Sequence, residues 1–491
     1  EAAPHRTDPG MWVLVALLGL SRGVYADPWG HSDGEGGAYL ERKIGGKFLA
    51  EVAGEGMPTP VALIRRGNSD VLMFPSLTDL IEYMGKNCKK CLLTLDEGAD
   101  YYIDTIITEF PRENFRLEGS WAAIRFMGDE DAARATAEVA NGPTMELFKQ
   151  EPKKGKYRVA SSATVIIFQA NTENVTISNL RLGLNYLVGG FSSVTNFTNI
   201  TVQNVEIVDV PMVSFAVNFV AFEDVVQTGF TIKNCTVNSQ GFGINLAARN
   251  GISENHNISS NTILQSTGHA ILYSGVGYSV IRSNNVSNVN LLPPPPDRFG
   301  HGIAVDGNCG MDPVHSVTIE GNRIDSVYGY NQIRDRYEGI EIADGIFNVT
   351  LRDNYVSNVE LGYGIYFGGG CHHSVGAVIR GNYISNVKDY GVRIENRMQT
   401  DNHSTSDVTV YNNTIVGCSP AGIFTGNKSA NVDIIQNTLI NSGNLSTVAV
   451  HPPCMNCTKQ GNVAKGEAPP DIWDPPFSYF GRKGGQARTR W

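Results

Sequence analysis

The sequence predicts an all-β fold, a parallel β-helix in which successive coils stack on one another. A degenerate repeat fills residues 174–445 and reads Asn-x-[Val/Ile]-x-x-Asn-x-[Val/Ile], then a short gap, then Gly-[Ile/Val]-x-aliphatic. Its copies recur mostly at roughly 20 to 40 residues, a spacing typical of stacked repeat proteins. Within each copy, as at residues 175–177 and 408–410, apolar and polar residues alternate, which is typical of strands. Because one repeat cannot bury its apolar face alone, the coils must stack.

Asn and Gly occupy the corners between the predicted strands, where both residues tolerate left-handed backbone angles. An Asn amide at a corner can also pair with the Asn one coil away. The copies of the first half-repeat begin near Asn174, Asn199, Gly229, His256, Tyr278, His315, Asn348, Gly376, Asp407 and Asn431.

This repeat resembles the right-handed, single-stranded parallel β-helix of the pectin-lyase-like superfamily, over about residues 90–450. The resemblance implies an elongated solenoid with a polymer-binding strand face. A leucine-rich repeat is the structural alternative. It requires a Leu-x-x-Leu-x-Leu frame, and this chain has Ile or Val with Asn instead.

Residues 74–86 predict a short helix with Ser76 as its N-cap. Its apolar face is formed by Leu77, Leu80, Ile81 and Met84. Residues 91–95 and 101–107 predict strands around a turn at Asp96. A β-helix exposes unpaired strand edges at its ends, and these are usually covered. We therefore expect an N-terminal capping helix.

The chain is expected to have four parts: a leader and signal peptide (1–26), an N-terminal segment with the capping helix (27–90), the β-helix (91–450), and a C-terminal cap or flexible tail (451–491). The signal peptide is predicted because the apolar stretch 12–20 is too short to span a membrane and precedes a small-residue cleavage pattern. The alternative is a buried apolar strand. We expect a secreted, extracellular protein.

The composition of the chain limits the classes of partner that it is expected to bind. The formal net charge of −10 argues against non-specific nucleic-acid binding, but local charge matters more than the total for an acidic polysaccharide. We expect a polysaccharide partner, no nucleic acid, no membrane, and a monomer.

The cysteines and the potential N-glycosylation sites are both consistent with an exported protein. Of 8 cysteines, Cys88/Cys91 and Cys454/Cys457 form Cys-x-x-Cys pairs that predict disulfides. The pairing of Cys309 and Cys371 is left open. Asn-x-Ser/Thr sites are abundant because the repeat itself spells them, and we expect some to carry glycan.

The half-repeat that begins with Gly aligns seven strands and predicts which side chains point outward. The Ile or Val after the Gly faces the core, so the residue after it faces outward. The first outward column is Asn245, Leu272, Ala304, Glu341, Tyr366, Arg393 and Phe424. Two residues further along, the second column is Ala247, Ser274, Asp306, Ala343, Gly368, Glu395 and Gly426.

Ionisable residues concentrate in these columns. Neighbouring coils stack at roughly 4.8 Å, so these ionisable residues should lie on one face of the solenoid. A patch of ionisable side chains is a candidate functional site. The predicted catalytic residues are Asp306, Glu341, Tyr366, Arg393, Glu395 and His301. Loops beside the strands add His269, Asp344, His372 and His373. The alternative is an exposed ion-pair ladder in which Glu341 and Glu395 flank Arg393.

Two chemistries fit these residues. Glycoside hydrolysis needs two carboxyl groups, which Asp306, Glu341 and Glu395 can supply. Lysis or epimerisation of a uronate needs a cation to neutralise the sugar carboxylate and a base for the adjacent proton. Arg393 with Tyr366 or His301 can serve. We predict no cofactor and no metal site, although calcium bridging a sugar carboxylate to Asp306 or Glu341 stays open.

Short motifs refine the resemblance. Gly300-His301-Gly302 resembles the Gly-His-Gly of polygalacturonase-type hydrolases, and Arg393-Ile394 resembles the start of their Arg-Ile-Lys, with Glu395 in place of Lys. Their Asn-Thr-Asp and Asp-Asp motifs are absent, as is the Asp-Pro-His of alginate epimerases. We therefore expect a carbohydrate-active protein that cleaves or modifies an extended, uronate-containing polysaccharide, either a lyase or a hydrolase. The alternative is a non-catalytic extracellular protein that binds glycan or matrix partners.

Overall fold

The computed structural model describes part of the chain. The described residues are 12–15, 61–64, 71–103, 105, 107–108, 110–126, 164–168, 171–184, 189–210, 215–275, 277–291, 300–307, 314–329, 337–369, 372–396, 404–426, 428–442, 448–450 and 454–466. The chain divides into two compact units, each treated separately below. Unit 1 comprises residues 1–218 and 226–237, and unit 2 comprises residues 219–225 and 238–491.

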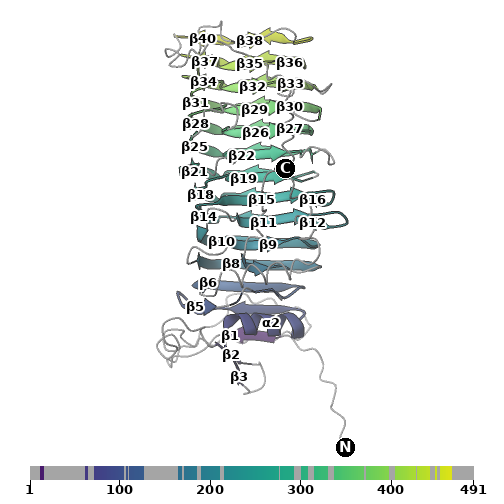
Figure 1. Ribbon diagram of the computed structural model, residues 1–491, viewed down its shortest axis with the longest axis vertical. Coiled ribbons are helices and arrows are strands. Elements are labelled where there is room, and N and C mark those ends of the chain that lie inside the picture. The colour runs from purple at the N-terminus through teal and green to yellow at the C-terminus, as the bar shows by residue number, and fades with distance from the viewer. Residues whose placement is uncertain are drawn as a thin grey trace, which may run out of the picture. The chain divides into compact units, whose positions relative to one another are not determined.

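Unit 1 is built from parallel strands that pair in the order β1, β4, β6, β8, β10. One helix and a small antiparallel pair, β2 with β3, lie near its N-terminal end (Figure 1). The elements are β1 (Trp12–Val15), β2 (Val61–Ile64), β3 (Val71–Phe74), α2 (Leu77–Asn87), β4 (Cys91–Thr94), β5 (Asp100–Ile103), β6 (Phe115–Phe126), β7 (Thr164–Ile167), β8 (Thr172–Leu184), β9 (Gly189–Ser193), β10 (Phe197–Val210), β12 (Val226–Thr228) and β13 (Thr231–Lys233). Strands β11 (Phe215–Ala221) and β14 (Thr236–Ser239) cross the division.

Helix α2 confirms the predicted helix and its N-cap. The Asp79 backbone N–H donates to Ser76 Oγ at 3.2 Å, as a capping serine should. The predicted apolar face of Leu77, Leu80, Ile81 and Met84 is buried. The helix packs on β5, and Thr78 Oγ1 donates to the Thr105 carbonyl at 3.1 Å. The strand predicted over 101–107 ends earlier, at Ile103.

Unit 2 repeats coils of parallel strands (Figure 1), in which sheet I receives up to three strands per coil and sheet II receives one. Sheet II contains β15 (Phe242–Ala248), β19 (Ile271–Ser274), β22 (Ile303–Asp306), β26 (Ile340–Ala343), β29 (Ile365–Gly368), β32 (Val392–Ile394), β35 (Ile423–Thr425) and β38 (Val448–Val450). Sheet I contains β16 (Ile252–Glu254), β17 (Asn257–Ser259), β18 (Thr262–Gln265), β20 (Val280–Arg282), β21 (Asn285–Val289), β23 (Val314–His315), β24 (Thr318–Glu320), β25 (Arg323–Val327), β27 (Ile346–Arg352), β28 (Tyr355–Val359), β30 (Ser374–Arg380), β31 (Tyr383–Val387), β33 (Thr405–Tyr411), β34 (Thr414–Val416), β36 (Ser429–Ile435), β37 (Thr438–Ile440), β39 (Thr458–Gln460) and β40 (Val463–Lys465).

The core of unit 2 confirms the predicted inward positions. The Ile or Val that follows the repeat Gly or Ala is at most 1% exposed in every predicted coil: Ile244, Ile271, Ile303, Ile340, Ile365, Val392 and Ile423. At roughly 25 cal/mol for each Å² of buried apolar surface, these columns supply the main driving force for stacking.

Two kinds of Asn build the corners. One kind adopts the left-handed backbone that the repeat predicts, for example Asn348 with φ 57° and Asn358 with φ 56°. The other forms a buried ladder in which each side-chain amide donates to the next coil at 2.9–3.0 Å. The ladder runs through Asn261, Asn284, Asn322, Asn354, Asn382, Asn413, Asn437 and Asn462.

Disulfides join Cys88 to Cys91 and Cys454 to Cys457, as predicted, whereas Cys309 and Cys371 lie outside the described residues. Residues 12–15 of the predicted signal peptide form β1 beside β4. No helix among the described residues is long and apolar enough to cross a bilayer.

Candidate functional site

The candidate site is built from two side-chain columns on sheet II of unit 2. The flanking column contains the residue just before each repeat Gly or Ala, and backbone hydrogen bonds such as Gly302 N to Glu338 O set its register. Its members are Phe242, His269, His301, Glu338, Tyr363, Tyr390 and Ala421. The strand column is the predicted outward column, and its register is confirmed at each step: Asn245, Leu272, Ala304, Glu341, Tyr366, Arg393 and Phe424.

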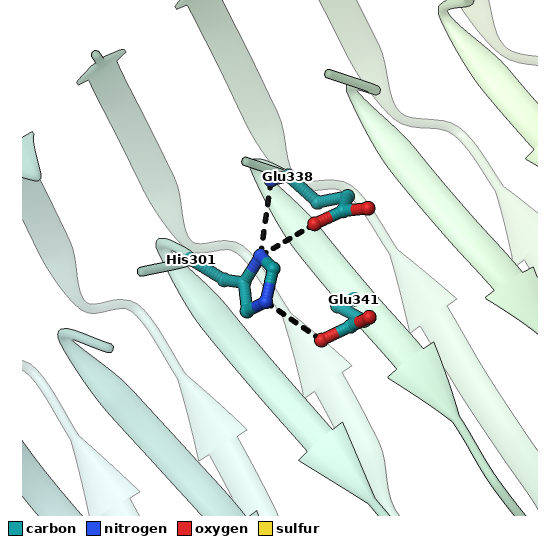
Figure 2. Close-up of side chains that lie close together, drawn as sticks. All are labelled: His301, Glu338 and Glu341. Carbon is teal, nitrogen blue, oxygen red and sulfur yellow. Dashed lines mark hydrogen bonds and ion pairs between the residues drawn. The ribbon is translucent and has the colours of Figure 1, made fainter. Parts of the chain in front are cut away.

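His301 lies between two glutamates (Figure 2). Its Nδ1 is 2.6 Å from Glu338 Oε2, and its Nε2 is 2.8 Å from Glu341 Oε2. The His301 and Glu338 side chains are 0% exposed, whereas that of Glu341 is 13% exposed. The three residues therefore form a chain from a buried carboxylate, through the imidazole, to a carboxylate that reaches solvent.

The surroundings of His301 favour its charged form. Burial alone would lower the pKa of His301, but the negative charges of Glu341 and Glu338 raise that pKa to about 10. The Glu338 backbone N–H also points at Nδ1 from 3.0 Å, a contact that suits a neutral ring. A cationic ring compensates one of the two negative charges that the carboxylates bring to this buried site, and a neutral ring compensates neither, so the imidazolium is the favoured form at neutral pH.

His269 stacks on His301 with the ring centroids 4.8 Å apart. The pKa of His269 lies well below its usual value because the ring is buried and the His301 charge adds repulsion. A neutral His269 therefore covers one face of the His301 ring without adding a second charge.

The same three residues are the cluster of possible metal ligands in the described part of the chain, with one ligand atom from each within 4.8 Å of the others. A cation at Nδ1 would lie next to Glu338, and a cation at Nε2 would lie next to Glu341, because the two nitrogens face different carboxylates. Metal-bound histidine uses one nitrogen for the metal and the other for a hydrogen-bond partner. The arrangement fits a proton relay better than a three-ligand metal site.

Arg393 occupies an aromatic cage two coils from Glu341. Its Cζ lies 4.4 Å from the Tyr363 ring centroid and 5.4 Å from those of Tyr390 and Phe424. Its guanidinium also pairs with Glu395. A Cβ at Gly426 would collide with the Glu395 carboxylate, so glycine there makes room for this pair.

Tyr366 is 1% exposed, which corrects the expectation that the strand column forms an open face. Its hydroxyl donates to the Glu395 carbonyl at 3.1 Å, and its ring lies 5.9 Å from that of Tyr363. Large aromatic side chains in adjacent columns cover one another here, which the alternation of inward and outward residues does not reveal. Among the predicted residues, Glu341, Arg393 and Glu395 keep side chains that are 11–16% exposed.

Asp306 and His373 interact with residues outside the two columns described above. Asp306 lies opposite Ala343 in the second predicted column. Its charge acts on Arg249, whose pKa is lowered by burial and partly restored by Asp306. His373 Nδ1 lies 3.0 Å from Ser404 Oγ. The structure thus joins His301 to Glu341, and it joins Glu395 to both Arg393 and Tyr366.

Sequence reasoning missed Glu338, Tyr363 and Tyr390. All three occupy the repeat position of His269 and His301, directly before the glycine. Aligning that position, instead of assigning it to loops, would have found the whole flanking column.

Comparisons with known proteins agree with this architecture. Residues 300–463 match the family described as a right handed beta helix region. The A-module of the mannuronan C-5 epimerase AlgE6 of Azotobacter vinelandii is 16% identical, with 79% of this chain and 93% of that chain covered and a TM-score of 0.52. The AlgE4 A-module of the same organism is 12% identical, with coverage of 79% and 92% and a TM-score of 0.47.

The catalytic domain of a GH87 alpha-1,3-glucanase in complex with tetrasaccharides is 14% identical, with coverage of 79% of this chain and 67% of that chain and a TM-score of 0.46. No curated protein matches the sequence. At 16% identity the likeness to the AlgE6 module concerns the fold alone. The chain therefore carries a right-handed parallel β-helix, the fold of the pectin-lyase-like superfamily that the repeat resembles.

Proposed function

We propose that this chain is an enzyme that modifies an extended, uronate-containing polysaccharide on sheet II by removing the proton beside the sugar carboxylate. Glu341 is the proposed base. The observation that carries this proposal is the chain from Glu338 through His301 to Glu341, which ends on a carboxylate that reaches solvent.

The role of Glu341 follows from its partner. A general base must be ionised and within reach of the proton it removes. His301 Nε2 lies 2.8 Å from one oxygen of Glu341 and holds that carboxylate in place. Glu338, buried behind the ring, keeps the imidazole oriented toward Glu341.

Arg393 supplies the cation that this chemistry needs. It lies two strands from Glu341 in the same column, which is roughly 10 Å at the usual strand spacing. A sugar carboxylate would compete with Glu395 for the guanidinium. Pairing there would stabilise the negative charge that develops when the neighbouring proton leaves. Elimination would then break the glycosidic C–O bond at the next ring carbon, with water protonating the leaving oxygen, and would give an unsaturated uronate. Return of a proton from water to the opposite face would instead give the epimer.

Hydrolysis fits the site less well. It requires one carboxylic acid that holds a proton near neutral pH. Glu338 and Glu341 both contact His301, and Glu395 contacts Arg393. Each of these carboxylates already pairs with a basic side chain, an arrangement that suits a base better than a proton donor.

A non-catalytic glycan-binding protein is the second candidate. It is favoured by the low exposure of Tyr363, Tyr366 and Tyr390 and by the aromatic contacts that already surround Arg393. In that case the same residues would stabilise the stack and present only their edges to a ligand.

The test is incubation of the full chain in heavy water with alginate, polygalacturonate, hyaluronan and a neutral β-glucan. New reducing ends, ultraviolet absorbance of unsaturated uronates, and deuterium at the carbon beside the carboxylate are followed together. We expect deuterium or absorbance with one uronan, and loss of the signal in Glu341→Gln. Glu360→Gln is the matched control, because Glu360 is 41% exposed and pairs only at 3.8 Å with Lys388. Reducing ends without the other two signals would indicate hydrolysis, and silence on every uronan would favour the binding protein.

We also propose that the chain is exported. The predicted signal peptide and the disulfides Cys88–Cys91 and Cys454–Cys457 support this, because disulfides persist in oxidising compartments. N-terminal sequencing of protein from the culture medium should find a start near Asp27. Retention of residues 12–15 in the secreted chain would favour the strand β1 instead.

A further inference from the structure

A second surface on unit 2 combines arginine and tyrosine. It lies on the outer face of sheet I and consists of Arg323, Tyr355, Tyr383, Arg352, Arg380 and Tyr411, here named the Arg–Tyr surface. Arg323, Tyr355 and Tyr383 are successive partners in register on β25, β28 and β31. Arg352, Arg380 and Tyr411 are successive partners on β27, β30 and β33. The two columns flank the corner that holds the Asn ladder.

The tyrosines form an ordered stack with an open end. The Tyr355 and Tyr383 rings are 5.2 Å apart and inclined by 8°, and Arg323 Cζ covers the other side of Tyr355 at 4.3 Å. The next residue in this column is Thr414, which is too short to cover the far face of Tyr383. Tyr383 and Tyr411 are each 39% exposed. A flat ring face is therefore available to a ligand.

Positive charges outnumber negative ones beside this stack, with Arg323, Arg352 and Arg380 set against Glu320 and the exposed corner residue Asp353. Arg323 and Arg380 are exposed, and Arg352 and Arg380 face each other across neighbouring strands. Within the described part of the chain, the ion pair of this surface joins Arg352 Nε to Glu320 at 2.6 Å. Two exposed guanidinium groups remain beside the aromatic face, on a chain whose formal net charge is −10.

We propose that the Arg–Tyr surface is a non-catalytic binding site for a carboxylated polysaccharide. A guanidinium pairs with a carboxylate through two parallel hydrogen bonds, and an aromatic face suits the C–H-rich face of a sugar ring. Successive coils repeat at roughly 4.8 Å, about the advance of one sugar in an extended chain, so each coil meets another sugar. The Arg–Tyr surface lies on a different sheet from the His301 site. This binding role goes beyond the proposed function and rests on it only for the choice of polymer.

Binding is best measured in a Glu341→Gln background, so that turnover cannot change the ligand. Affinity electrophoresis and calorimetry with polygalacturonate, alginate and a neutral β-glucan give the affinity, at low and at moderate salt. The double variant Arg323→Glu/Arg380→Glu should weaken polyuronate binding by on the order of a hundredfold, because each charge-assisted contact is worth roughly tenfold. Tyr383→Ala should weaken it by about threefold to tenfold.

The matched control is Lys89→Glu/Lys90→Glu in unit 1, which makes the same change in net charge at two exposed positions. It should bind as tightly as the parent. Arg323→Lys/Arg380→Lys keeps the charge but loses the paired hydrogen bonds, and should bind with intermediate affinity. All variants should retain the parent's unfolding midpoint, since the altered side chains are exposed.

Unchanged polyuronate affinity in the double glutamate variant would overturn the proposal, and so would equally tight binding of the neutral glucan. A dimer in the parent that Tyr383→Ala converts to a monomer would instead identify this face as an interface between copies. An inactive parent protein would refute the proposed function but leave the binding result standing, so the two failures are distinguishable.

Discussion

At the scale of single residues, the proposed site depends on the charge of His301. A lone histidine in a Gly-His-Gly corner gives no indication of its charge, and its neighbours decide it. Glu338 and Glu341 come from the next coil and contact the two ring nitrogens. Stacking thus brings together an acid–imidazole–acid chain whose members are 37 and 40 residues apart, as their numbers show.

His301 should make the stability of the protein depend on pH in one direction. Its pKa is raised from 6.5 to about 10 in the folded state. The stabilisation from its charge is therefore complete below about pH 6.5 and is lost as pH rises through about 10. Denaturant unfolding should show His301→Gln to be less stable than the parent at pH 6, with a gap that narrows toward pH 10. His315→Gln on sheet I is the control, and a gap that widens with pH would mean that His301 is neutral.

Gly426 should be intolerant of even one methyl group. A Cβ there would meet the Glu395 carboxylate and the Phe424 ring, so the Arg393–Glu395 pair must shift. We expect Gly426→Ala to lower the free energy of unfolding by about 1–3 kcal/mol. Gly277→Ala is the control, since its Cβ would lie 3.5 Å from the nearest atom, an ordinary contact. Equal effects of the two substitutions would show that the Glu395 carboxylate does not occupy this space.

At the scale of elements, the Asn ladder links the coils of unit 2 through buried side chains. Asn354 is typical: its amide donates to Asn382 Oδ1 at 3.0 Å and to the Ile319 carbonyl at 2.9 Å. Its own Oδ1 accepts from the Asn322 backbone N–H at 3.0 Å. A buried polar group that loses its partner costs more than the hydrogen bond contributes.

Asn354→Ala should therefore lower the free energy of unfolding by about 3 kcal/mol, because it leaves buried groups on both neighbouring coils unpaired. Thermal and denaturant unfolding measure the change. Asn285→Ala, at an exposed position of β21, should cost less than about 0.5 kcal/mol. A small effect of Asn354→Ala would indicate that water replaces the amide.

The repeat predicted the elements because corner residues and alternation are local properties. The inward Ile and Val residues and the register of the strand column followed from it, and helix α2 followed from the N-cap Ser76 and the apolar pattern of residues 74–86. The burial of Tyr366 and the partners of His301 did not, because they depend on side chains of neighbouring coils. Glu338 illustrates what the sequence alone could not predict. Its repeat position was visible in the sequence, but only the fold places that position on the same face as Glu341.

At the scale of the whole molecule, the ends of a parallel β-helix determine its solubility. Helix α2 packs on β5 in unit 1, with Leu80 and Ile81 each 0% exposed. An uncovered strand edge pairs readily with another chain. We therefore propose that helix α2 limits association at the N-terminal end of unit 1.

Leu80→Asp should release this helix and promote assembly. The buried charge costs several kcal/mol, so the helix should detach before the strands unfold. Light scattering should show concentration-dependent growth in the variant, while circular dichroism retains the strand signal. Lys89→Asp, at an exposed site after the helix, should remain like the parent. A Leu80→Asp variant that stays monodisperse would show that α2 is dispensable for covering the edge.

The central claim is that Glu341, held by His301 and Glu338, removes a proton beside a uronate carboxylate. The most direct measurement is deuterium incorporation at that carbon in heavy water, with the parent, Glu341→Gln and Glu360→Gln compared on the same uronan. We predict that the parent and Glu360→Gln give deuterium at that carbon or, where elimination follows, the ultraviolet absorbance of an unsaturated uronate, and that Glu341→Gln loses the signal by at least about a hundredfold. Incorporation that persists in Glu341→Gln would contradict the assignment of the base.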